Sequence, residues 1–252
     1  MRPVRAPPRG RHPRMATVLA VAATCVACAA APARANPPPA PDRLYAGLAG
    51  TVLLDNPWVH VERFVLAPGQ STGARAGGAN RLVVFIHGGT LRSNADGRAT
   101  VWHDGRVAWH PAIEAGDAGV TNAGTTPVDF EWVTVKPTAP ADTVAPPAYH
   151  YLNYPNIPGE DVLDNERVIV QRFVVQPGQW EGVHAHHPGM LYIHVRGGQW
   201  AARSKQEPEH TYPDASPDGS VGWMDTIPLS AGHESGNVGD RPIDLIWITL
   251  KH

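Results

Sequence analysis

The stretch that decides most about this chain is Gly178 to Met190, GQWEGVHAHHPGM. It places His184 and His186 two residues apart on a predicted strand, so both imidazoles leave the same face of that strand. His233, in a distant segment, supplies a third imidazole. Imidazole is a common ligand of transition metals, so these three residues predict a metal site.

The sequence around this stretch repeats an earlier part of the chain. Residues 55–89 recur at a constant offset as 164–198, with Asp-Asn, Arg-Phe, Pro-Gly-Gln and Gly-Gly in matching places. After a longer loop in the second copy, residues 122–136 recur as 237–251. Two copies of one domain therefore follow each other.

Both copies have the pattern of β structure. Runs such as RLVVFIHGG and MLYIHVRGG are rich in β-branched and aromatic residues and end in turn-forming residues. No long stretch has helical periodicity, so we expect an all-β chain of small closed barrels. The predicted domains are residues 40–137 and 148–252, joined by a Pro-rich linker at 138–147.

The first 35 residues have the pattern of a secretory signal peptide. Five arginines precede the apolar segment from Met15 to Ala31, and Ala33-Arg34-Ala35 offers a cleavage site. Cleavage near Ala35 would give a secreted or periplasmic protein with no membrane association. A retained anchor and a lipid-modified Cys28 are the open alternatives.

Removal of this segment changes the chemistry of the chain. Cys25 and Cys28 are its only cysteines, so the mature protein would have no disulfide and no thiol catalysis. Six of the 21 Lys and Arg residues precede Asn36, which leaves 15 against 23 Asp and Glu, a formal charge of −8. Such an acidic chain is a poor partner for nucleic acid.

The second copy resembles the cupin family over its whole length. The first cupin motif, G-x5-H-x-H-x3-E-x6-G, is met at Gly178, His184, His186 and Gly197, with Met190 in place of the glutamate. The second motif, G-x5-P-x-G-x2-H-x3-N, is met at Gly222, Pro228, His233 and Asn237, with Ser230 in place of the inner glycine. Together with the repeat, this resemblance implies two tandem cupin-type jelly-roll β-barrels.

The resemblance also implies a cofactor and its ligands. In cupins the motif histidines hold one divalent transition metal, commonly Fe, Mn, Ni, Cu or Zn, so His184, His186 and His233 would be metal ligands. Because Met190 is a weak ligand without charge, the site would be three neutral imidazoles with positions open for water, substrate or dioxygen.

The first copy lacks these ligands. Arg75, Gly77, Arg81 and Ala118 stand at the four corresponding positions, so this half cannot hold the metal. We expect it to be a structural partner that covers apolar surface of the second barrel. The alternative is that Arg75 and Arg81 clamp a carboxylate or phosphate group.

Strand alternation from Met190 places Tyr192 and His194 on the inner face of the second barrel. Either side chain could orient a substrate or shuttle a proton, so these two are the candidate catalytic residues. Glu181 and Glu234 flank the ligands in sequence and could hydrogen-bond to the ligand side chains without binding the metal themselves.

Two further features near the site have simpler interpretations. His187 is expected to face solvent. The polar loop from Ser204 to Ser220, which the first copy lacks, is either a lid over the pocket or an ordinary surface loop.

Three functions of different classes remain open. The first is a metal-dependent dioxygenase acting on a small oxygenated or carboxylated molecule. The second is a non-catalytic protein that binds a small ligand such as a sugar or carboxylate. The third is a copper-handling protein, in which the sulfur of Met190 would join the histidines. A homodimer is compatible with all three.

Overall fold

The computed structural model describes residues 43–112, 116–137 and 151–251. The regular structure in these residues is sixteen β-strands and one 3-10 turn, as the predicted all-β class requires. None of the described helical structure is long and apolar enough to cross a membrane. The predicted signal peptide and linker, residues 1–35 and 138–147, fall outside the described residues.

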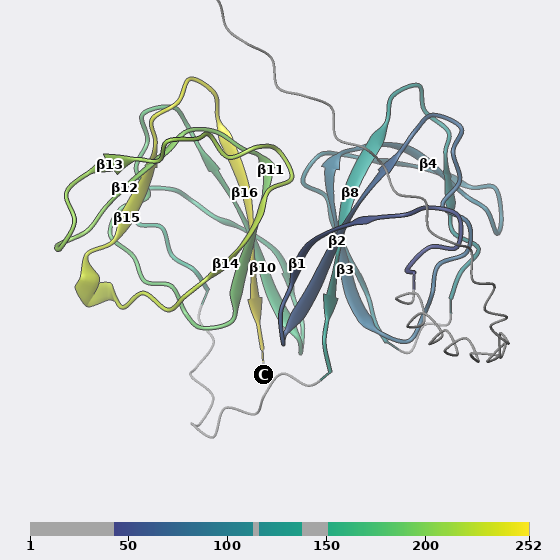
Figure 1. Ribbon diagram of the computed structural model, residues 1–252, viewed down its shortest axis with the longest axis horizontal. Helices are drawn as coiled ribbons and strands as arrows, with labels where there is room; N and C mark the ends of the chain where they lie inside the picture. The colour runs from purple at the N-terminus through teal and green to yellow at the C-terminus, as the bar shows by residue number, and fades with distance from the viewer. Residues whose placement is uncertain (1–42, 113–115, 138–150, 252) are drawn as a thin grey trace, which may run out of the picture. The chain divides into compact units, whose positions relative to one another are not determined.

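The first sequence copy forms two antiparallel sheets (Figure 1). The five-stranded sheet has the order β1-β2-β8-β3-β6 and the three-stranded sheet the order β5-β4-β7. The strands are β1 (Thr51–Asp55), β2 (Val59–Leu66), β3 (Asn80–His87), β4 (Gly89–Ser93), β5 (Ala99–Trp102), β6 (Val107–His110), β7 (Val120–Asn122) and β8 (Val128–Val135).

The second copy has the same topology. Its sheets have the orders β9-β10-β16-β11-β14 and β13-β12-β15, which match the first copy strand for strand. The elements are β9 (Glu160–Asp164), β10 (Val168–Val175), β11 (Met190–Arg196), β12 (Trp200–Arg203), β13 (His210–Thr211), β14 (Val221–Met224), the 3-10 turn η1 (Leu229–Ala231), β15 (Glu234–Asn237) and β16 (Ile243–Leu250). The predicted fold of two tandem jelly-roll domains is confirmed, but the expected closed barrels are not seen, because each domain consists of two separate sheets.

Strand β11 shows how alternation divides the apolar residues. Met190 and Tyr192 belong to the cluster inside the second domain, which also contains Trp247. Leu191 and Ile193, on the opposite face, belong to a different cluster. The strand is therefore buried on both faces, and only its inner face leads to the site described below.

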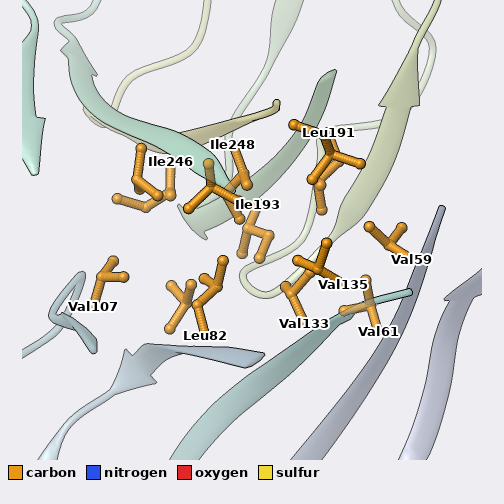
Figure 2. Close-up of a cluster of buried hydrophobic side chains, with 14 of the residues drawn as sticks. Val59, Val61, Leu82, Val107, Val133, Val135, Leu191, Ile193, Ile246 and Ile248 are labelled. Atoms are coloured by element: carbon orange, nitrogen blue, oxygen red, sulfur yellow. The ribbon is translucent and has the colours of Figure 1, made fainter. Parts of the chain in front are cut away.

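The cluster that contains Leu191 and Ile193 is shared by the two domains (Figure 2). It forms where the outer faces of the two five-stranded sheets meet, and each fully buried aliphatic side chain in it contributes on the order of 1.5–3 kcal/mol. Its labelled members are Val59, Val61, Leu82, Val107, Val133 and Val135 from the first domain and Leu191, Ile193, Ile246 and Ile248 from the second. The first domain therefore covers apolar surface of the second.

Two arginines at equivalent positions extend this contact. Arg63 of the first domain donates from Nη1 to the Asp218 carbonyl oxygen of the second, at 3.2 Å. Arg172 of the second domain packs against Gly105 of the first, where a Cβ would lie 2.5 Å from the guanidinium carbon. Each arginine is held by an ion pair within its own domain: Arg63 with Asp129 at 2.5 Å, and Arg172 with Asp244 at 2.6 Å.

Candidate metal centre

The three predicted ligands lie at one end of the second domain's interior, on two segments outside the strand ladders. His184 and His186 precede β11 in an extended segment whose pairing is an isolated bridge from His186 to Ile227. The prediction that they lie on a strand is therefore wrong. Pro188 has no N–H to donate to a ladder, and Gly189 has a positive φ of 76°, so the chain turns before β11 begins.

Backbone hydrogen bonding joins the two ligand segments. The His184 N–H donates to the His233 carbonyl oxygen at 3.1 Å, and His233 itself lies between η1 and β15. The second-motif histidine is thus held beside the first-motif pair by main-chain contacts.

The imidazoles have the geometry of a metal-ligand set. The Nε2 atoms of His184 and His186 are 2.8 Å apart, and one ligand atom from each of the three rings lies within 4.8 Å of the others. Nitrogen ligands about 2.1 Å from a shared ion lie roughly 3–3.5 Å apart, so only small movements would bring the rings around one ion. His184 and His186 are 2% exposed and His233 is half-buried.

The ring of His184 is oriented for this role. Its Nδ1 lies 2.8 Å from the Gly182 carbonyl oxygen, which accepts only if Nδ1 carries the proton, so Nε2 keeps its lone pair. Burial lowers the pKa of His184 to about 4 and that of His186 to about 3. Both imidazoles are therefore neutral at pH 7, the form that binds a metal.

A cavity of about 440 Å³ opens beside the histidines. Its walls combine His186 and His233 with side chains from β11, β12, β14 and β16 and from the inserted loop. That loop contributes Tyr212, Pro213, Asp214 and Ser216, so it forms part of the pocket wall. The volume suits a small molecule.

Both candidate catalytic residues line this pocket. Tyr192 is half-buried, and burial raises the pKa of its hydroxyl. Gly222 leaves the space that its ring fills, since a Cβ there would lie 2.3 Å from the Tyr192 hydroxyl oxygen. The motif glycine is thus explained by packing against Tyr192.

His194 is held more tightly than Tyr192. Trp200 donates from Nε1 to His194 Nε2 at 3.0 Å, and His194 Nδ1 lies 2.8 Å from the Ser220 hydroxyl oxygen. Because an indole can only donate, Nε2 is unprotonated and Nδ1 carries the proton. Burial lowers the pKa of His194 to about 4, so the ring is a neutral acceptor that fixes the Trp200 indole.

Met190 is fully buried in the apolar cluster inside the domain. Its Sδ accepts a hydrogen bond from the His187 N–H at 3.3 Å, and it is not among the residues that line the cavity. The His187 side chain, predicted to face solvent, is partly exposed.

Of the two flanking glutamates, Glu181 lies at the centre and Glu234 does not. Glu181 is 2% exposed, lines the cavity, and places Oε2 3.8 Å from His184 Nε2. Burial raises the pKa of its carboxyl to about 8. Glu234 instead accepts from Arg203 Nε at 2.7 Å. The motif spacing does not identify Glu181 as part of the centre, because this residue lies outside the cupin motif.

The corresponding place in the first domain is filled by an internal ion pair. Arg75, at the position of His184, donates from Nε to Asp117 at 2.9 Å, and its guanidinium lies 5.2 Å from the centre of the Trp132 ring. Arg81 donates to the Thr134 hydroxyl oxygen at 3.2 Å. These contacts within the domain favour a structural role for the first copy over an anion clamp.

The fold is that of cupins, as comparison with solved structures shows. A variant of oxalate decarboxylase from Bacillus subtilis is 13% identical, with a TM-score of 0.50 over 79% of this chain and 71% of that one. The Lactobacillus farciminis oxalate decarboxylase, solved with formate, is 15% identical, with a TM-score of 0.50 over 78% of each chain. No family model and no curated protein matches the sequence. At these identities the likeness concerns the fold alone.

Proposed function

We propose that the second domain binds one divalent transition metal through His184, His186 and His233 and acts as a metal-dependent dioxygenase on a small carboxylated or oxygenated molecule. The observation that carries this proposal is the position of the three neutral imidazoles beside a cavity of about 440 Å³. An ion held there would supply Lewis-acid and redox chemistry at the coordination positions the imidazoles leave open.

The residues around the cavity have distinct roles in this proposal. Trp200 and Trp247 form apolar walls that exclude water from a bound substrate. The Tyr192 hydroxyl donates a hydrogen bond to a substrate oxygen and so orients it. His194 is a positioning residue, because both of its ring nitrogens are engaged in holding Trp200 and Ser220.

The substrate class follows from the charge of the pocket. Three neutral imidazoles do not compensate the positive charge of a divalent ion, and one carboxylate beside them would lower it only to +1, so an anionic or oxygen-rich molecule is favoured. The fold does not select the reaction, because cupin barrels carry unrelated activities.

We further propose that the protein is exported and works as the chain that begins near Asn36. The arginine-rich, apolar and A-x-A sequence of the first 35 residues supports this. N-terminal sequencing of the protein recovered from outside the cytoplasm checks it, and an intact Met1 on the exported form would contradict it.

The proposed activity is tested on that mature protein. We expect about one redox-active transition metal per chain by elemental analysis, and oxygen uptake with at least one of a set of small diketones, catechols and aromatic acids. Binding of such a molecule without oxygen uptake would support the ligand-binding alternative. Zinc as the sole bound metal would contradict the dioxygenase.

The copper-handling alternative depends on the sulfur of Met190. Because Sδ accepts a hydrogen bond from His187 and does not line the cavity, we expect Met190→Leu to leave the affinities for Cu(I) and Mn(II) within about threefold of the parent. Competition titration against a chelator measures both affinities. A selective loss of Cu(I) affinity would favour the copper function instead.

A further inference from the structure

The carboxyl group of Glu181 has no established role, although it is the acidic group most deeply placed beside the three histidines. Its oxygen lies 3.8 Å from His184 Nε2, whereas the glutamate of the cupin motif is replaced by the buried Met190. Two neighbouring ligands of one ion, each about 2.1 Å from it, lie roughly 3–3.5 Å apart. The observed separation exceeds this range by a few tenths of an ångström, so a small side-chain movement would bring the carboxyl oxygen to a ligand position.

The position of Glu181 is fixed by its neighbours. Trp247 donates from Nε1 to the Tyr154 hydroxyl oxygen at 2.7 Å, and the Tyr154 ring packs against the His184 ring with their centres 4.6 Å apart. The Glu181 N–H donates to the Ser235 carbonyl oxygen at 2.9 Å, and the Glu181 carbonyl oxygen accepts from the Asn156 N–H at 3.1 Å. The backbone of Glu181 is therefore fixed beside the histidines, and its carboxyl group lies 3.8 Å from His184 Nε2 before any ion binds.

Charge balance points to a cation at this place. Within the described residues no lysine or arginine pairs with Glu181, and the basic group nearest to it is the neutral imidazole of His184. The ionised form of this buried carboxyl group is costly without a cation, and three neutral imidazoles do not compensate it, so its ionisation requires a cation nearby. A divalent ion between the carboxylate and the imidazoles would compensate it directly.

Comparison of the two sequence copies also supports a cation beside Glu181. The first domain has the equivalent pair of Trp132 and Tyr45, with the indole donating to the hydroxyl oxygen at 2.8 Å. At the position of Glu181 it has Thr72, and at that of His184 it has Arg75. The carboxylate is thus present in the copy with the three histidines and absent from the copy without them.

We propose that Glu181 is the fourth, anionic ligand of the metal centre and takes over the role of the motif glutamate that Met190 replaces. This inference depends on the proposed metal site. It makes the site a three-histidine, one-carboxylate centre whose carboxylate comes from the segment before the first motif histidine, and such a centre binds hard ions such as Mn(II) better than imidazoles alone.

The test is the Mn(II) affinity of the mature protein, measured by titration calorimetry for the parent, Glu181→Gln and Glu234→Gln. We expect Glu181→Gln to weaken Mn(II) binding by about 10- to 100-fold, because the amide keeps the shape but lacks the charge. Glu234→Gln removes a carboxylate that also adjoins a ligand but pairs with Arg203, so we expect a change below about threefold.

The outcomes separate this inference from the proposed function. If the parent binds no metal, the proposed metal site fails; if the parent binds Mn(II) and Glu181→Gln binds it equally well, only the role of Glu181 fails. Equal weakening by both variants would indicate a general effect of charge and would also overturn it. The melting temperature of metal-free Glu181→Gln checks folding, and Glu181→Asp, which keeps the charge, provides a second variant expected to retain more affinity than Glu181→Gln.

Discussion

The double variant His184→Ala, His186→Ala is expected to lose all bound metal. It removes two of three imidazoles, including the pair whose Nε2 atoms lie 2.8 Å apart, and leaves His233 alone with Glu181. The parent should gain about 2.7 kcal/mol of stability at a metal concentration 100 times its dissociation constant, whereas the variant should gain none. Elemental analysis and thermal unfolding with and without metal measure both effects.

Two variants in the first domain serve as controls for this loss. His87→Ala removes an exposed histidine, and Arg81→Ala removes a side chain at a position equivalent to Met190. Both should retain the metal content of the parent, since the described first domain contains no cluster of metal-ligating side chains. Full metal occupancy in the double variant would show that the ion is held elsewhere.

The second large effect is expected on the free energy of unfolding, and it concerns Glu131, whose carboxyl group is buried between the two domains. Glu131 is 0% exposed, and its carboxyl oxygens have no hydrogen-bond partner among the described residues. Its neighbours Phe130 and Trp132 point into the first domain, whereas Val133 belongs to the shared cluster, so alternation along β8 places Glu131 on the face toward the second domain. In the second copy this position is Ile246.

Burial raises the pKa of Glu131 to about 8 from an ordinary value near 4.5. The folded protein therefore binds more protons than the unfolded chain between these values. The stability linked to this proton is fully present below pH 4.5 and is lost as the pH rises toward 8, at up to about 1.4 kcal/mol per pH unit.

Replacing this group with an apolar one should remove that dependence. We expect Glu131→Leu to raise the free energy of unfolding by about 3 kcal/mol at pH 7, with a larger gain at pH 9 and a small one at pH 5. Urea unfolding of parent and variant at the three pH values measures the gain. Glu160→Leu, at an exposed position on β9, should show no comparable trend, and a pH-independent gain in Glu131→Leu would contradict the assignment.

The sequence repeat and strand alternation predicted the fold well, because both depend on local patterns. The constant offset between the copies corresponds to identical strand orders, and Met190 and Tyr192 do share the inner face of β11. Alternation alone did not show which face meets the other domain, since Leu191 and Ile193 are as apolar as an ordinary core. That choice depends on contacts between residues far apart in the sequence.

The candidate site was predicted in part, for a related reason. The motif spacing identified His184, His186 and His233, which the structure brings together. The place of Glu181 depends on main-chain hydrogen bonds with Asn156 and Ser235, which lie in two other segments of the chain, and no local pattern links them. The engagement of both ring nitrogens of His194 likewise became clear only when Trp200 and Ser220 were placed beside it.

Arg63 and Arg172 each contact the other domain, and this reciprocal arrangement resembles an isologous dimer interface. Each copy presents the same arginine and the same sheet face to the other, as two identical subunits do around a twofold axis. The chain thus contains, in one polypeptide, a contact of the kind that two identical subunits make with each other. Because that face is already occupied within the chain, a homodimer of the present protein would have to use a different surface.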